Sequence, residues 1–161
     1  MITEDFGRAG FVEGDPAVPI AERYEAAADL LAALHRQALP ETLPVAPHIA
    51  YAIPNFDTEA LLVEAGLMLD WYLPDRGAEP DSHARAEFVA MWRDLLRRRA
   101  AAPRTWVMRD FHSPNLIWLA ERSGLARVGV IDFQDAVLGP PSYDLVSLLQ
   151  DARIDVPEQL E

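Results

Sequence analysis

Residues 107–118, VMRDFHSPNLIW, place several polar side chains in one short turn between two apolar flanks. The flanks indicate buried elements, and polar side chains among buried elements need hydrogen-bond partners or a chemical role. The polar residues of the turn are Arg109, Asp110, His112, Ser113 and Asn115. A further aspartate, Asp132, lies at the end of the apolar run RVGVID. Their types and order suggest a site that handles charged groups.

Asp110, Asn115 and Asp132 could supply oxygen atoms to one cleft. Asp110 follows the strand-like run RTWVM, and Asn115 opens the run NLIWL. We expect these two runs to form one hairpin, with the strand that ends at Asp132 beside it. Two carboxylates and an amide oxygen, without His or Cys, suit Mg²⁺ better than Zn²⁺. Such a site suits phosphoryl transfer, which uses a metal and a carboxylate that deprotonates the attacking hydroxyl.

The same residues also have an ordinary structural interpretation. Asp132 could be a turn residue at a strand end, and Asp110 and Asn115 could form Asx turns within a loop. His112 could contact a substrate, but we favour a hydrogen bond within the loop. Trp71 and Tyr72 are expected in the core rather than as a platform that stacks on a sugar.

Helical patterns precede and follow this region. Apolar spacing predicts helices over residues 19–37, from Asp57 or Thr58 to a stop at Pro74, and over residues 82–101. The four prolines between residues 40 and 54 are expected to prevent regular structure there. After the strand-like runs, residues 143–151 resume a helical pattern. The order predicts an α+β fold that is mostly helical, with a small β cluster that carries the polar loop.

Composition limits the class of protein. The 161 residues suit one domain, and 26 acidic against 14 basic residues give a formal net charge of −12. A surface this acidic disfavours nucleic acid and anionic membranes as partners. There is no cysteine, no apolar run near the roughly 20 residues of a membrane span, and no signal-peptide pattern at the start. These features predict a cytoplasmic protein.

The segment MRDFHSPN resembles the catalytic loop of the aminoglycoside phosphotransferase family, His-x-Asp-x-His-x-x-Asn, and VIDFQDAVLGPPSYDL resembles its metal-binding segment and the helix that follows. The resemblance implies the C-terminal lobe of a protein-kinase-like fold, with ATP as co-substrate. It implies Asp110 as catalytic base and Asn115 and Asp132 as Mg²⁺ ligands. Four residues are expected to support them: Arg109, His112, Asp135 and Asp144. Asp135 would hold the loop after the metal ligand, and Asp144 would brace the catalytic loop. Met108 stands where the family has its first His, and we expect this to affect local packing more than chemistry.

The resemblance narrows further at residues 54–75, PNFDTEALLVEAGLMLDWYLPD. This segment is similar to the substrate-side helix of bacterial kinases that phosphorylate the anomeric hydroxyl of N-acetylmuramate and N-acetylglucosamine in cell-wall recycling. A small amino sugar is therefore the expected substrate. Two alternatives stay open: a kinase of the same family that acts on an aminoglycoside or another small molecule, and a non-catalytic remnant that serves as a binding scaffold.

The sequence lacks the features that bind the phosphates of ATP in kinases. The sequence has no lysine and no G-x-G-x-x-G turn, both of which kinase-like phosphoryl transfer uses. ITEDFG, residues 2–7, instead resembles the family's hinge between lobes. We therefore expect residues 1–18 to be the interlobe hinge and lead-in, and residues 19–161 to be the C-terminal lobe. The N-terminal lobe would then be absent, the isolated chain inactive, and the face left by that lobe available for a homodimer.

Overall fold

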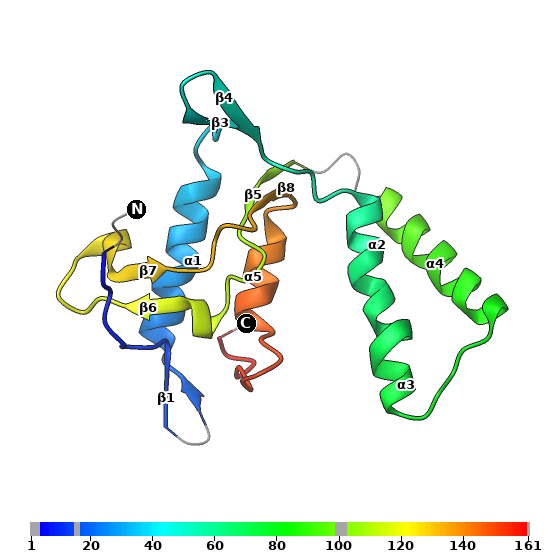
Figure 1. Cartoon of the computed structure of the whole chain (residues 1–161). Coiled ribbons are helices and arrows are strands. Elements are labelled where there is room, and N and C mark those ends of the chain that lie inside the picture. Colours follow the sequence, from blue (N-terminus) through cyan, green and yellow to red (C-terminus); the bar gives the residue numbers. More distant parts are fainter. Residues whose placement is uncertain (1–3, 15–16, 99–102, 161) are drawn as a thin grey trace.

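The computed structural model describes residues 4–14, 17–98 and 103–160. Its body contains the helices α1 (Ala21–His35) and α5 (Ser142–Leu149), packed beside short strands, and an arm of α2, α3 and α4 extends to one side (Figure 1). The arm contains α2 (Thr58–Leu67), the π-helical turn η1 (Met68–Tyr72), α3 (Leu73–Asp75) and α4 (Ser82–Arg97). The mixed helix and strand content agrees with the α+β expectation. Among the described residues, no helix has the length and apolar character to cross a membrane.

The strands form four antiparallel pairs. These are β1 (Val12–Glu13) with β2 (Val18–Pro19), β3 (Thr42–Ala46) with β4 (Ile49–Ala52), β5 (Thr105–Val107) with β8 (Val137–Gly139), and β6 (Leu116–Trp118) with β7 (Val128–Val130). Two 3₁₀ turns, η2 (Ser113–Asn115) and η3 (Gly124–Arg127), precede β6 and β7. The small sheets thus connect parts of the chain on both sides of the polar loop.

Local sequence explains where the helices begin. The Asp57 carboxylate accepts a hydrogen bond from the Ala60 N–H at 3.0 Å, and Asp81 accepts one from the Ala84 N–H at 2.8 Å. Each side chain satisfies a backbone donor that has no partner within the first turn. Helix α1 instead depends on its buried face, because Tyr24, Ala27 and Leu31 recur at helical spacing and all lie in the core.

The extent of the predicted helix in the arm is confirmed, but the expected burial of its aromatic residues was wrong. The predicted helix runs through α2, η1 and α3 to Asp75, one residue beyond the expected stop at Pro74, with the Leu73 N–H bonded to the Met68 carbonyl. Pro74 lies in the first turn of α3, where a residue without an N–H is tolerated. Trp71 and Tyr72 are not in the core: they are 73% and 55% exposed, because they lie on η1, which among the described residues packs mainly against its chain neighbours α2 and α3. Residues 99–101 of the predicted third helix lie outside the described residues.

The predicted hairpin between the flanks of the polar loop was also wrong. β5 pairs with β8, and β6 pairs with β7, so the two flanks belong to different sheets. β8 precedes Pro140 and Pro141 and was not expected, because it is only three residues long. The polar loop therefore crosses from one sheet to the other.

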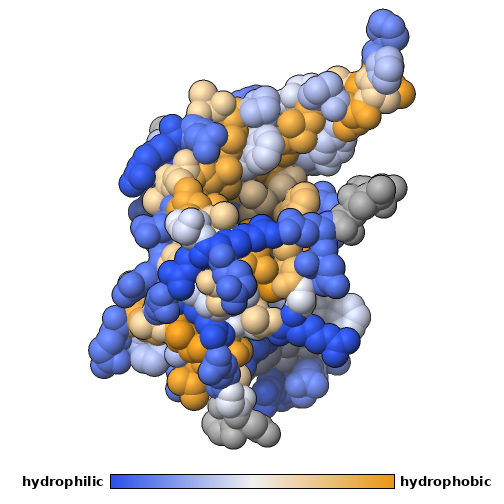
Figure 2. All heavy atoms as spheres, turned by 90° about the vertical axis from the view of Figure 1, so that its left-hand side faces the viewer, coloured by the Kyte–Doolittle hydropathy of each residue, from blue (hydrophilic) through white to orange (hydrophobic). Residues whose placement is uncertain are grey.

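The proline-rich segment forms a hairpin rather than an irregular connection. β3 and β4 pair with Pro44 opposite Ala50, and the turn places His48 at a φ of 63°. A two-stranded sheet has only edge strands, where a proline without an N–H is tolerated. The hairpin stands beyond the C-terminal end of α1 (Figure 1). Its residues Val45, Ile49 and Tyr51 are exposed, and Figure 2 shows hydrophobic side chains interspersed with hydrophilic ones on the face it displays.

The main core lies between α1, α5 and the β6–β7 pair. Among the described residues, it contains ten buried ones: Phe11, Tyr24, Ala27, Leu31, Phe111, Leu116, Trp118, Val128, Leu148 and Val156. Phe111 belongs to the polar loop itself and is only 1% exposed. Burial of the Phe111 ring in the core therefore attaches the loop to the body of the protein through the hydrophobic effect.

We expect Phe111→Ala to lower the free energy of unfolding by about 3–5 kcal/mol, because it removes a buried aromatic ring and leaves a cavity. Urea denaturation followed by circular dichroism measures this change. Phe133→Ala is the matched control, because Phe133 is exposed in the loop after β7. Equal losses in the two variants would contradict the anchoring role of Phe111.

Candidate active site

The loop after β5 is held by one buried carboxylate. The two oxygens of Asp144, in the first turn of α5, accept hydrogen bonds from the backbone N–H groups of Met108 (2.7 Å) and Arg109 (3.0 Å). Asp144 is completely buried. Because the contact is with the backbone, the side chain at position 108 takes no part in it. The structure thus shows how Met can stand where the family pattern has His.

Arg109 adopts an unusual backbone conformation. Its φ of 69° lies in the left-handed region, which costs a residue other than glycine about 1–3 kcal/mol. The contact with Asp144 holds its N–H, and the Ser147 hydroxyl donates to its carbonyl at 3.3 Å. Its guanidinium lies 5.6 Å from the centre of the Phe56 ring. Several elements therefore keep Arg109 in this conformation.

The next residues send their side chains to different environments. Asp110 is exposed, Phe111 enters the core, and His112 is buried. The Asp110 carbonyl accepts hydrogen bonds from the His112 N–H and from Nδ2 of Asn115, both at 3.0 Å. The His112 Nε2 atom lies 3.7 Å from Oδ1 of Asp110. The Asp110 carboxylate is thus exposed at the apex of an ordered loop.

Strand pairing brings Asn115 and Asp132 together. Leu116 pairs with Val130, and the Ile131 N–H donates to the Asn115 carbonyl at 3.0 Å. Asp132 therefore follows directly after the residue bonded to Asn115. It also has a left-handed φ, of 58°, and its Oδ1 accepts a hydrogen bond from Gln134. Asn115 is thus bonded both to the Asp110 carbonyl and to the residue before Asp132, although a different pairing from the expected hairpin achieves this.

Among the expected supporting residues, Asp135 differs because its side chain does not hold the loop through a hydrogen bond or ion pair with the described residues. That side chain is exposed. The contact within its loop comes from Gln134 instead. No local pattern favours Gln134 over its neighbour, because both side chains are polar and both lie in the same turn.

Sequence reasoning missed Glu64 and Tyr143. Glu64 lies on α2, and its two carboxylate oxygens accept hydrogen bonds from Nη2 of Arg109 and from the Tyr143 hydroxyl, each at 2.8 Å. The bond to Glu64 raises the pKa of Arg109, and burial followed by the same carboxylate raises the pKa of Tyr143. The two partners are 45 and 79 residues from Glu64 in the chain, so no local pattern indicates the contact.

Ser113 and Asp151 were also missed as a pair. The Ser113 hydroxyl donates to Oδ2 of Asp151 at 3.0 Å, and the Asp151 side chain is fully buried. Burial would raise the pKa of Asp151, but the Arg153 N–H, the Ser113 hydroxyl and nearby His112 together hold it below its ordinary value. This bond ties the end of the polar loop to the segment after α5.

The oxygen atoms of Asn115 and Asp132 are ligands of the kind that a hard divalent cation prefers. Nδ2 of Asn115 donates to a carbonyl, which leaves the amide oxygen available as a ligand, and the Asp132 carboxylate belongs to the residue that follows the backbone partner of Asn115. Mg²⁺ is usually held by one or two carboxylates, with water and phosphate supplying the rest. No group of three or more His, Cys, Asp or Glu residues within the described ranges could hold a metal. The set suits Mg²⁺ and lacks the nitrogen or sulfur ligands that Zn²⁺ prefers.

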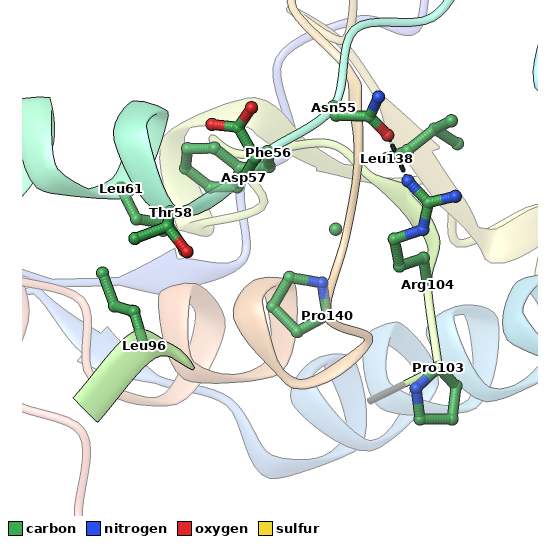
Figure 3. Close-up of a pocket in the computed structure, with 11 residues that line it drawn as sticks. Asn55, Phe56, Asp57, Thr58, Leu61, Leu96, Pro103, Arg104, Leu138 and Pro140 are labelled. Carbon is green, nitrogen blue, oxygen red and sulfur yellow. Dashed lines mark hydrogen bonds between the residues drawn. The ribbon is translucent and has the colours of Figure 1, made fainter. Parts of the chain in front are cut away.

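A cavity of about 540 Å³ lies elsewhere in the molecule. Figure 3 shows its lining between the start of α2, the end of β8 and Arg104, whose guanidinium is hydrogen-bonded to Asn55. The cavity adjoins the beginning of β5, whereas the polar loop follows the end of that strand. None of the predicted site residues lines it.

Comparison with known proteins identifies the class of molecule. Residues 5–161 match the phosphotransferase enzyme family. The match spans nearly the whole chain and confirms the resemblance seen in the loop and metal-segment motifs. The chain belongs to this family.

The curated relatives share one name. The chain is 38% identical to the N-acetylmuramate/N-acetylglucosamine kinase of Caulobacter vibrioides over 88% of its length, and 31% identical to that of Pseudomonas aeruginosa over 98%. A protein of the same name from Neisseria meningitidis is 39% identical over 66% of the chain. The aligned parts cover 39%, 43% and 31% of these three relatives, respectively. The chain therefore spans less than half the length of the relatives it matches.

We expect Asp144→Ala to destabilise the protein, because two buried N–H groups lose their acceptor, at about 1–3 kcal/mol each. Thermal and urea unfolding measure the loss. Ser147→Ala is the control on the same helix, since it removes a single, longer bond to the loop and should cost about 1 kcal/mol. A loss for Asp144→Ala no larger than that of the control would contradict the bracing role.

The pH dependence of stability provides a separate check on Asp144. Burial raises its pKa from 3.8 to about 6, against the opposing effect of the two N–H donors. The folded state then holds this proton more tightly than the unfolded state, so the stabilisation is complete below about pH 4 and is lost as pH rises through about 6. Relative to Asp144→Asn, the wild-type free energy of unfolding should fall by about 3 kcal/mol over this range. Parallel pH profiles would contradict the raised pKa.

Proposed function

We propose that this chain is the catalytic and substrate-binding lobe of an ATP-dependent sugar kinase. The reaction would transfer the γ-phosphoryl group of Mg–ATP to a hydroxyl of an amino sugar such as N-acetylmuramate or N-acetylglucosamine. The observation that supports it most is the exposed Asp110 carboxylate, held on an ordered loop beside Asn115 and Asp132.

Asp110 is suited to act as the general base. Its backbone is fixed by the bonds to His112 and Asn115, and the preceding residues are fixed by Asp144. A carboxylate held in this way can accept the proton of the sugar hydroxyl without losing orientational freedom during the reaction. His112 lies behind Asp110 and is buried, which favours a role within the loop over contact with the sugar.

Asn115 and Asp132 would hold Mg²⁺ through the amide oxygen and the carboxylate. The bound ion would neutralise charge on the ATP phosphates. The left-handed backbone at Asp132 and the bond from Gln134 to its carboxylate orient this residue before any ligand binds. Preorganisation of this kind reduces the reorganisation needed during the reaction.

The relatives' shared name is the reason to prefer an amino sugar over an aminoglycoside or another small molecule. Residues 54–75, which resemble the substrate-side helix of such kinases, form α2, η1 and α3. The bond between Glu64 and Arg109 joins α2 directly to the catalytic loop. A sugar bound against α2 would therefore lie near Asp110.

We propose further that residues 1–18 form the interlobe hinge and that residues 19–161 form the C-terminal lobe. The 161 residues contain no lysine to hold ATP phosphates, and they correspond to less than half of each relative. The nucleotide-binding lobe would lie outside these residues, and the chain alone would be inactive.

The decisive experiment is a kinase assay on a chimera in which this chain replaces the matching segment of the Caulobacter relative. N-acetylmuramate, N-acetylglucosamine and kanamycin are offered separately with Mg–ATP, and ADP release is measured. Turnover of the amino sugars is expected; turnover of kanamycin alone would reject the sugar assignment. Calorimetry of the 161-residue chain with Mg–ATP tests the division into lobes, because tight binding would contradict it.

In the chimera, we expect Asp110→Asn to lower kcat by about 10²–10⁴-fold, the usual contribution of a positioned general base. The change preserves the shape and removes the proton acceptor. Asp155→Asn, which alters an exposed aspartate outside the loop, should leave kcat unchanged. An unaltered kcat in Asp110→Asn would reject this residue as the base.

A further inference from the structure

We propose that Glu64 is a positioning residue that acts through Arg109 to fix the orientation of Asp110. The inference rests on the proposed function in assigning Asp110 its catalytic role. It adds a residue of α2, distant in sequence from both family motifs, to the groups on which turnover depends.

The contacts that carry the inference converge on one residue. Arg109 is attached through its N–H to Asp144, through its carbonyl to Ser147, and through its guanidinium to Glu64. The first two partners belong to α5 and the third to α2. The contact with Glu64 is the charged one, and its N–O distance is 2.8 Å.

Glu64 is itself held in place. Its second oxygen accepts the Tyr143 hydroxyl at 2.8 Å, so one carboxylate bridges a catalytic-loop residue and a residue at the start of α5. The Glu64 and Arg109 side chains are 30% and 37% exposed, so the pair is partly shielded from solvent. Such shielding strengthens a hydrogen-bonded ion pair compared with one on an open surface.

The position of Arg109 makes this contact matter for Asp110. Arg109 immediately precedes Asp110 and has a φ of 69°. If its guanidinium were released, only the backbone bonds to Asp144 and Ser147 would oppose relaxation of the residue toward the ordinary negative-φ regions. Such a rotation would turn the following peptide and redirect the Asp110 side chain. The carboxylate of Glu64 would thus maintain a backbone conformation that the sequence at Arg109 does not itself favour.

The first test measures loop order in the 161-residue chain. Amide hydrogen exchange is followed by NMR in wild type, Glu64→Ala and Glu64→Gln. We expect exchange at the Asp110 and His112 amides to accelerate about tenfold in Glu64→Ala, the equivalent of losing one charge-assisted hydrogen bond. Glu64→Gln, which retains an acceptor for one partner, should show a smaller change.

A matched control comes from the same helix. Glu59 on α2 makes an ion pair with Arg93 of α4 at 3.2 Å and has no hydrogen bond or ion pair with the loop among the described residues. Glu59→Ala therefore removes an ion pair from α2 without touching Arg109. It should leave exchange at Asp110 and His112 unchanged, even where it lowers the melting temperature of the protein.

The second test measures catalysis in the chimera. Glu64→Ala should lower kcat by about 10–100-fold, in line with the cost of misplacing a catalytic group, while the KM for ATP stays within about twofold of wild type. Glu64→Gln should recover part of kcat. A merely structural role would not separate kcat from KM in this way, nor distinguish Glu64→Ala from Glu59→Ala.

The outcomes of the two tests distinguish failure of the positioning role from failure of the proposed function. Equal loop exchange in wild type and Glu64→Ala would overturn the positioning role, whatever substrate the chimera accepts. So would an unchanged kcat in Glu64→Ala. If the unsubstituted chimera phosphorylates no sugar, the proposed function fails, and the exchange measurement alone decides whether Glu64 orders the loop.

Discussion

The candidate site depends on the buried carboxylate of Asp144. A charge placed in a protein interior is costly unless hydrogen bonds satisfy it, and here the satisfying donors are the backbone N–H groups of Met108 and Arg109. The requirement works in both directions: α5 needs the loop to satisfy its aspartate, and the loop needs the aspartate to hold its turn. Packing of Phe111 in the core adds a second attachment. The exposed part of the loop can therefore be polar because its other side is fixed.

Most of what could be predicted from the sequence came from local patterns. The helical spacing of Tyr24, Ala27 and Leu31 predicted α1, and Asp57 was a candidate cap before the structure showed its bond to Ala60. Features that depend on distant partners could not be predicted. Nothing near residue 105 indicates that β5 pairs with residues 137–139 rather than with β6. The β3–β4 hairpin was missed because prolines usually exclude a strand, a rule that weakens when both strands are edges.

In the site, too, residues in local motifs could be predicted, whereas residues that act through distant partners could not. The oxygen-bearing residues Asp110, Asn115 and Asp132 were recognisable by type and order, and in the structure Asn115 is bonded to the Asp110 carbonyl and, beside the β6–β7 pair, to the residue before Asp132. Glu64 was not recognisable, because a glutamate on a helix has many possible partners and its two actual partners are 45 and 79 residues away. Asp135 and Gln134 show the limit of reasoning from type alone: adjacent polar residues differ in which one makes the contact.

Three consecutive side chains of the loop lie in three different environments: Arg109 contacts α2, Asp110 is exposed to solvent and Phe111 is buried in the core. This arrangement constrains how the gene can change. A substitution at one position affects one of these environments, and Met108 shows that a neighbouring side chain can be replaced while the backbone contact is kept. Insertion or deletion of a single codon would instead shift all three assignments at once, placing a charge toward the core or a phenyl ring in water. Variation among homologous loops should therefore occur by substitution at constant length.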